Sequence, residues 1–333
     1  MHQSSAIDQK QSCLQKAILE GPGPRTKKDS ALLFLKGCAM GTADIIPGVS
    51  GGTVAFVTGI YSNLIAAISS IDANFLKQLL TGKLFQAISI VHTRFLLPLS
   101  LGIACAIIIM ARPMHYFIVH HQIHTWSIFL GLIAASILVM GKQIEKFYVP
   151  RNLITIILGA VLAYTLIGVI PVQTPNNALI IFFTGAIGAT AMILPGISGA
   201  FILLLLGKYE YITQCIRNPF VVENFMTIII FSLGFFTGLI SFSKLLKFLL
   251  KKHQQYILCL LTGFMIGAMR KIWPWKSVIQ EKIIRGKTYV LQEANVLPPE
   301  YNSSFFWAIA LAILGFAIVL LIDSLSTNKI EEI

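Results

Sequence analysis

Charged residues are scarce in this sequence, and their scarcity excludes an ordinary soluble protein. Only 12% of the 333 residues are charged, whereas 56% are hydrophobic. The mean hydropathy of +0.77 lies outside the range of soluble domains. Apolar stretches approaching the roughly 20 residues of a membrane-spanning helix recur between Ala31 and Asp323. The sequence therefore predicts an all-α polytopic membrane protein.

Acidic residues and paired cysteines are also few. The chain has 14 acidic against 26 basic residues, a net charge of +12. The basic residues lie in short loops beside apolar stretches, as topology signals and headgroup contacts do, so we expect no nucleic-acid partner. The five cysteines are scattered without a CxxC pair, so we expect neither a disulfide framework nor a zinc site. Histidines at 115, 120, 121 and 124 lack a regular ligand spacing; we expect an interfacial loop there, and no metal or cofactor.

Two apolar segments are interrupted by the same motif. Pro47-Gly48-Val49-Ser50-Gly51 matches Pro195-Gly196-Ile197-Ser198-Gly199. Further identities at the same offset include Gly37/Gly185 and Tyr61/Tyr209, and a second offset aligns Gly102/Gly234 and Gly131/Gly263. These matches indicate an internal duplication.

Each copy is predicted to hold a broken helical hairpin followed by three transmembrane helices. We expect those helices at Phe95–Met110, Thr125–Met140 and Leu153–Ile170, then at Asn224–Ser243, Tyr256–Met269 and Ser304–Ile322. The number of crossings per copy is odd whether the hairpin is re-entrant or spans, so the copies should form two inverted-topology repeats. The expected organisation is a polar tail over 1–29 without a cleavable signal peptide, repeats over 30–175 and 176–323, and a C-terminal tail over 324–333. A cytoplasmic N-terminus leaves the basic loop after Arg270 on the outside.

The paired breaks are the strongest candidate for a site. Irregular backbone at membrane depth survives only against protein or a water-filled cavity. Proline and glycine at the breaks (Pro47, Gly48, Pro195, Gly196) either permit tight helix packing or open a site, and half-helix N-termini suit an anion. The residues expected to contact that anion are Ser50, Gly51, Gly52, Thr53, Ser198 and Gly199.

Charged residues near these segments are further candidates. Asp44 lies well inside an apolar segment, where it either binds a coupling proton or caps the half-helix after the break. Lys36, Arg112 and Arg270 are expected to supply positive charge to the anion, although headgroup anchoring is the alternative for both arginines. Tyr61 and Tyr209 are expected to anchor at the interface. We predict no catalytic residues, because one buried carboxylate is too few for a hydrolase.

The motifs resemble a known family. Gly41-Thr42-Ala43-Asp44-Ile45-Ile46-Pro47-Gly48-Val49-Ser50-Gly51-Gly52-Thr53, Ala191 to Ala200 and Arg270-Lys271-Ile272-Trp273-Pro274-Trp275 look like the bacterial polyprenyl-phosphate transporter family. The resemblance covers roughly Ser30 to Asp323. It implies a multi-pass protein of the bacterial inner membrane that flips undecaprenyl phosphate, so that the lipid carrier is reused for peptidoglycan and other envelope polymers.

This resemblance agrees with the reading from the residues, which favours transport of a lipid-linked anion, with polyprenyl phosphate and membrane phospholipids as partners. Two alternatives stay open. One is a secondary transporter of a small soluble anion, and the other is a membrane lipid phosphatase or transferase.

Overall fold

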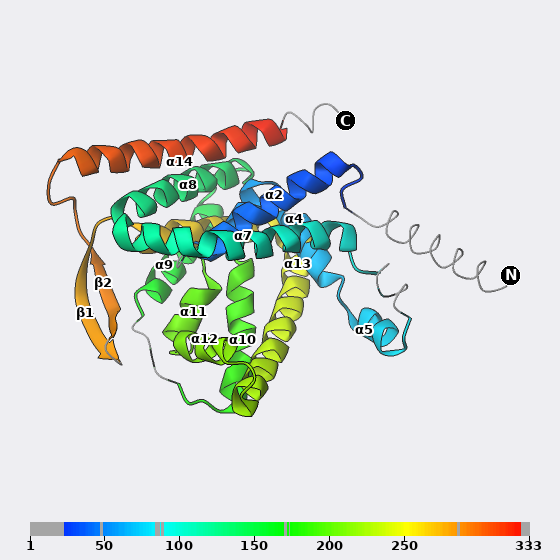
Figure 1. Cartoon of the computed structure of the whole chain (residues 1–333). Coiled ribbons are helices and arrows are strands. Elements are labelled where there is room, and N and C mark those ends of the chain that lie inside the picture. The colour runs from blue at the N-terminus through cyan, green and yellow to red at the C-terminus, as the bar shows by residue number, and fades with distance from the viewer. Residues whose placement is uncertain are drawn as a thin grey trace.

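The chain is almost entirely helical (Figure 1). The computed structural model describes residues 23–46, 49–83, 87, 90–169, 172, 174–284 and 287–327, so most of the predicted N-terminal tail and two predicted breaking residues, Pro47 and Gly48, lie outside the described residues. The first half contains α2 (Lys27–Asp44), α3 (Gly51–Val57), α4 (Tyr61–Ser69), α5 (Ala73–Leu80), α7 (Thr93–His120), α8 (Gln122–Lys142) and α9 (Pro150–Ile167). The second contains α10 (Ala178–Ile193), α11 (Gly199–Leu205), α12 (Tyr209–Arg217), α13 (Val222–Ile272), β1 (Lys276–Ile284), β2 (Lys287–Asn295) and α14 (Ser303–Thr327).

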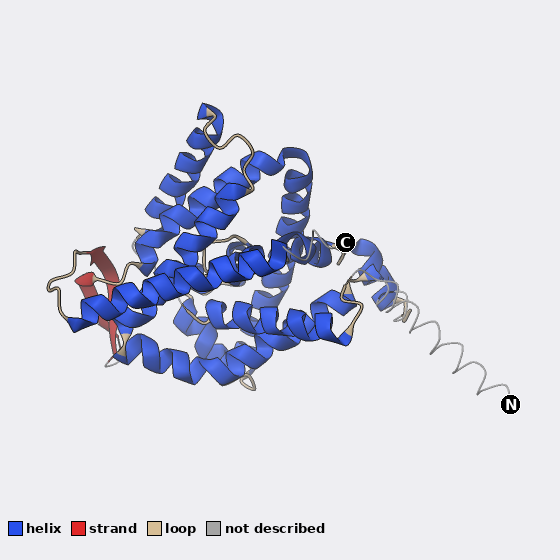
Figure 2. Ribbon diagram, turned by 90° about the horizontal axis from the view of Figure 1, so that it is seen from above, coloured by secondary structure: helices blue, strands red, loops and turns tan. Residues whose placement is uncertain are grey.

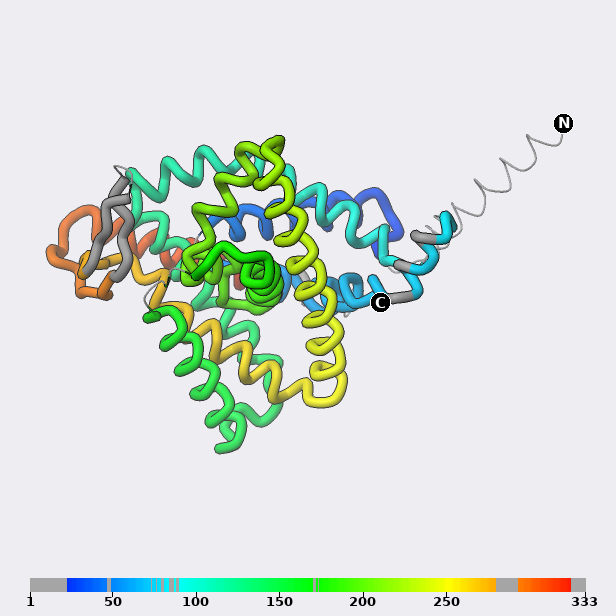
Figure 3. The backbone as a smooth tube through the Cα atoms, turned by 90° about the horizontal axis from the view of Figure 1, so that it is seen from below, coloured from blue at the N-terminus to red at the C-terminus, as the bar shows by residue number. Residues whose placement is uncertain are grey.

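Several helices are long and apolar enough to cross a membrane. In the described part of the chain they are α7, α8, α9, α13 and α14. The 51 residues of α13 are too many for one crossing, and the helix is kinked at His253, where φ is −136°. Figure 3 shows this bend in the yellow part of the tube. Large apolar side chains such as Ile108 and Leu321 are exposed on the outer surface, as contact with lipid requires. The predicted all-α membrane architecture is confirmed.

Closely packed helix pairs form both within each half and between the two halves. In the first half α2 packs along α7, and in the second α10 packs along α13. The last helix of each half instead packs on the other half, because α9 lies against α13 and α14 lies against α8. The α8–α14 pair is visible in Figure 1, and Figure 2 shows the helices from above with the two strands at one edge.

The glycines matched between the halves lie at these helix crossings. Gly37 and Gly102 face each other between α2 and α7, and their matches Gly185 and Gly234 lie between α10 and α13. At each site a Cβ atom would collide with the backbone of the partner helix. The duplicated sequence therefore specifies equivalent contacts in both halves, while the inverted orientation of the copies stays a prediction.

Some helix boundaries differ from those predicted. The helix expected to end at Met110 continues through Arg112 and Pro113 to His120 as α7, and α8 starts at Gln122. The predicted interfacial histidine loop is therefore wrong, because His115 and His120 are helical. A charged residue near the end of a span does not stop a helix whose backbone bonds are already internal.

The predicted loop from Arg270 to Tyr301 contains an antiparallel hairpin that sequence reasoning missed. β1 pairs with β2 from Lys276 opposite Asn295 to Ile284 opposite Lys287, with irregular register near Gln280. β1 contains four β-branched residues, and β2 contains the run Thr288-Tyr289-Val290, a signal hidden by the basic residues beside them.

Alanine at a crossing glycine should separate the helices. A Cβ on Gly131 would lie 1.9 Å from the Ala312 carbonyl oxygen, and one on Gly263 would lie 2.2 Å from that of Ile156. We expect Gly131→Ala and Gly263→Ala each to lower the free energy of unfolding by about 1–3 kcal/mol. Gly141→Ala is the control, because its nearest neighbour would be 3.9 Å away. Denaturant titration in detergent measures the three, and equal stabilities would contradict the packing.

Candidate functional site

The two broken segments meet in the structure. Ser50, the N-cap of α3, donates its hydroxyl to the carbonyl oxygens of Met192 at 3.3 Å and Leu194 at 3.1 Å. The same oxygen accepts the Gly52 amide at 3.1 Å. Ser50 therefore caps the start of α3 and the end of α10 at once. The expectation that the paired motifs face each other agrees with this geometry.

Two more hydrogen bonds join the segments. The Gly196 amide donates to Thr53 Oγ1 at 3.1 Å, and the Tyr61 hydroxyl donates to the Ile193 carbonyl oxygen at 3.2 Å. Gly196 has a φ of +86°, which glycine adopts without strain. Tyr61 is buried, so its predicted role as an interfacial anchor is wrong, whereas Tyr209 is exposed. We call the bonds made by Ser50, Thr53 and Tyr61 to the α10 break the inter-half latch.

Local sequence explains why α10 exposes carbonyl groups here. The residue before a proline is driven away from helical geometry, and Leu194 is extended with ψ of 124° before Pro195. Pro195 has no amide hydrogen, so the last turn of α10 lacks intrahelical partners. Only a glycine fits against the last turn of α10 at position 52, because a Cβ on Gly52 would lie 2.6 Å from the Ile193 carbonyl oxygen.

Asp44 lies at the first break. Its Oδ1 accepts the Gly51 amide at 2.7 Å, which places a carboxylate at the first turn of α3. No Lys, Arg or His among the described residues forms an ion pair with it. Of the two roles predicted for Asp44, this geometry corresponds to capping of the half-helix after the break. A negative group at a helix N-terminus is favourable. A coupling role for Asp44 stays a prediction.

The second break is arranged differently. Ser198 precedes α11 and is buried, but its side chain makes no cap hydrogen bond. Its hydroxyl has no hydrogen-bond partner within the described residues, while the matching Ser50 is fully engaged. Gly199 packs against the Met192 side chain. A role for Ser198 in binding a ligand stays a prediction.

The predicted cations do not gather at the breaks. The Lys36 ammonium donates to the Thr58 carbonyl oxygen at 2.6 Å, at the far end of α3 from Ser50. Arg270 donates to the Tyr164 carbonyl oxygen at 2.9 Å and stacks over the Tyr164 ring at 4.2 Å. Arg112 is exposed on α7. The structure therefore unites Asp44, Ser50, Gly51, Gly52, Thr53 and Gly196, and it places the three cations elsewhere.

The chain matches the family described as undecaprenyl phosphate translocase-like over residues 40–289. It belongs to this family. A polyprenyl-phosphate transporter of Vibrio cholerae serotype O1 is 37% identical over 294 residues, which cover 87% of this chain and 94% of the relative. A polyprenyl-phosphate transporter of Staphylococcus aureus is 32% identical over 255 residues, which cover 72% of this chain and 85% of the relative. No solved structure matches the chain significantly. This family member is a multi-pass bacterial membrane protein.

A second polar cluster in this family member was not anticipated from the sequence. Glu293 accepts hydrogen bonds from the ammonium groups of Lys271 and Lys276, both at 3.2 Å. Lys276 lies 5.0 Å from the centre of the Trp126 ring of α8, and Lys271 lies 5.9 Å from that of Phe201 in α11. The hairpin is thereby tied directly to α8 and, through Lys271 at the end of α13, to α11. The sequence signal that could have indicated this cluster is the presence of lysines and a glutamate in the predicted loop from Arg270 to Tyr301.

Burial decides the electrostatics of this cluster. Burial first and the neighbouring Lys271 second lower the pKa of Lys276, Glu293 opposes both, and the net result is a pKa of about 8. Burial alone would raise the pKa of Glu293, but the two lysines outweigh it and hold that pKa below its ordinary value. The cluster has two cations for one carboxylate.

Loss of the Ser50 hydroxyl should weaken the inter-half latch. Ser50→Ala leaves the Met192 and Leu194 carbonyl groups without this donor, so we expect the free energy of unfolding to fall by about 1–3 kcal/mol. Ser136→Ala is the matched control, because its buried hydroxyl bonds only the Leu132 carbonyl oxygen of its own helix, at 2.6 Å. Denaturant titration compares the two variants. A loss at Ser50 no larger than at Ser136 would contradict the latch.

The Lys276 cluster should respond to mildly alkaline pH. Lysine titrates near 10.5 when unfolded, so the folded protein gains stability as pH rises from about 8 toward 10.5. Loss of the charge over Trp126 should give an inflection in tryptophan fluorescence near pH 8. Lys271→Gln should move this inflection upward, Glu293→Gln should move it downward, and Lys276→Met should remove it. An inflection unchanged by all three would rule out this origin.

Proposed function

We propose that the protein is a flippase that carries polyprenyl phosphate, specifically undecaprenyl phosphate, between the leaflets of the bacterial inner membrane. Its relatives in Vibrio cholerae and Staphylococcus aureus carry the name polyprenyl-phosphate transporter. The observation that carries the proposal is the meeting of two broken segments, one from each half, inside an apolar fold. Irregular backbone at such depth is characteristic of transporter binding sites.

The cargo's chemistry fits this place. A phosphate that leaves water needs hydrogen-bond donors in return, and Ser198 offers a hydroxyl without another partner in the described chain. Ser50 and Thr53 bond the segment from Met192 to Gly196 that precedes Ser198, and Gly52 and Gly199 pack against the end of α10. The isoprenoid tail remains in the bilayer against the exposed apolar surface. Transport requires no covalent step, and we propose no enzymatic activity.

The movement would follow from the two-fold organisation. We take the halves to be inverted repeats that rock against each other about the paired breaks. The inter-half latch holds one arrangement, and rocking requires its bonds to exchange for others. In the proposed role, the carrier lipid returns to the inner leaflet and is reused in peptidoglycan synthesis.

Asp44 would couple this movement to protons. Its carboxylate holds the Gly51 amide across the break, and protonation would remove the charge that favours this contact. Because a fixed negative charge opposes a bound phosphate, protonation of Asp44 would also favour the cargo.

Proteoliposomes provide the test. We expect the wild type to move a fluorescent polyprenyl phosphate between leaflets, and Ser198→Ala to slow it at least tenfold because the free donor is lost. Asp44→Asn should retain lipid binding but lose its response to a pH gradient. Thr155→Ala is the control, because its exposed hydroxyl bonds only the Arg151 carbonyl oxygen of its own helix.

Each other outcome has a defined meaning. Uptake of inorganic phosphate without movement of the lipid would replace the proposal with a soluble-anion transporter. Release of inorganic phosphate from the lipid would indicate a phosphatase. Transport by Ser198→Ala at the wild-type rate would remove Ser198 from the cargo site.

A further inference from the structure

A basic pocket lies at the start of α2 and α7, far from the paired breaks. It has a volume of about 820 Å³ and lies between the segment from Pro24 to Ser30 and the segment from Thr93 to Ser100. α2 is 18 residues long, so the pocket is roughly 27 Å from Asp44 at the other end of that helix. The pocket is therefore separate from the proposed cargo site.

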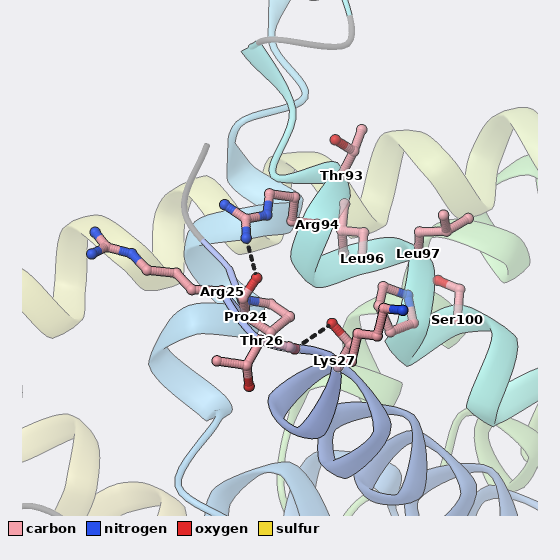
Figure 4. A pocket seen from close by; sticks show the side chains of 11 residues that line it. Pro24, Arg25, Thr26, Lys27, Thr93, Arg94, Leu96, Leu97 and Ser100 are labelled. Atoms are coloured by element: carbon pink, nitrogen blue, oxygen red, sulfur yellow. Dashed lines mark hydrogen bonds between the residues drawn. The ribbon is translucent and has the colours of Figure 1, made fainter. Parts of the chain in front are cut away.

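The charges lining this pocket are all positive. Arg25, Lys27 and Arg94 line it, and no acidic residue does within the described chain. Figure 4 shows Arg94 bonded to the Pro24 carbonyl oxygen and Lys27 beside the first turns of α7. The nearby Asp29 carboxylate accepts the Thr26 hydroxyl at 2.7 Å, within the cap of α2.

Hydroxyl groups accompany the cations. Thr93 and Ser100 line the same pocket, as does Ser30, whose hydroxyl donates to the Thr26 carbonyl oxygen at 3.1 Å. Cations and hydroxyl donors arranged around one cavity are the groups that bind phosphate oxygens. The chemistry of the polar end of the pocket is therefore that of an anion site.

The position of the pocket indicates a lipid. α7 is a membrane-spanning candidate, so its first turn lies near the level of lipid phosphates. Leu97 and Leu101 follow on the same face, one turn apart, and are 62% and 55% exposed. Leu96 and Pro98 complete the apolar side of the pocket. The polarity thus changes from cationic to apolar in the order of a phospholipid's headgroup and acyl chain.

We infer that this pocket binds the phosphate of an anionic phospholipid from the surrounding leaflet, with an acyl chain along Leu97 and Leu101. Basic pockets at the ends of transmembrane helices attract such headgroups. The site is additional to cargo transport, because the bound lipid belongs to the bilayer and stays in its leaflet.

Native mass spectrometry of the full chain from mixed micelles tests this inference. The probes are phosphatidylglycerol and phosphatidylcholine, with polyprenyl monophosphate and inorganic phosphate as separate arms. We expect Arg25→Gln/Lys27→Gln to bind phosphatidylglycerol about tenfold more weakly, since two surface cations are lost. Lys28→Gln/Lys83→Gln is the matched control, because it removes the same charge from exposed residues that do not line the pocket. Its affinity should stay within about twofold of the wild type.

Several results of this binding experiment would overturn the inferred phospholipid site. Equal loss in both double variants would mean that only overall charge matters, and it would overturn the site. Loss confined to polyprenyl monophosphate would assign the pocket to the cargo, and displacement by inorganic phosphate at equal affinity would show that no acyl chain is recognised. No binding of phosphatidylglycerol by the wild type would leave the pocket to another occupant, such as the chain before residue 23. Melting of each variant in detergent verifies that it is folded.

Discussion

The carbonyl groups at the end of α10 impose the constraint on which the site depends. Pro195 ends that helix inside an apolar fold, where water is not available to every backbone group. The partners come from the other half of the chain, as the Ser50 and Tyr61 hydroxyls. A local break in one half therefore becomes an attachment to the other, and packing alone does not explain why the broken segments lie together.

Equal sequence does not produce equal structure at the two breaks. Ser50 and Ser198 occupy matching positions, yet Ser50 bonds the α10 end and Ser198 bonds no described residue. Asp44 adds a carboxylate on one side only, where Met192 stands on the other. A duplicated motif can thus hold the halves together with one copy and keep the second copy's donor available to a ligand.

How far sequence reasoning reached depended on the range of the interaction. The duplication was visible, and the requirement to satisfy a broken backbone made a meeting of the breaks predictable. The partners of flexible side chains were not predictable. Lys36 donates to the Thr58 carbonyl oxygen at the end of α3, and the Tyr61 hydroxyl donates to the Ile193 carbonyl oxygen inside the protein. The hairpin was missed because lysines lie within both strands, whose apolar residues alternate irregularly.

The inter-half latch also sets an energy scale for the proposed motion. It consists of the hydrogen bond that Ser50 shares between the Met192 and Leu194 carbonyl oxygens and of single bonds of Thr53 and Tyr61, and each of these three has a net value of roughly 1 kcal/mol. Breaking all three without replacement would cost about 3 kcal/mol, which corresponds to a minor state near one per cent. A ligand shifts such an equilibrium only through differential affinity for the two states. The Ser198 hydroxyl has no described partner while the latch is closed, so a phosphate that bonds Ser198 alone would not shift the equilibrium. A phosphate that also bonds the Ser50 and Tyr61 hydroxyls, which are released only when the latch opens, would supply that difference and would make the movement depend on cargo.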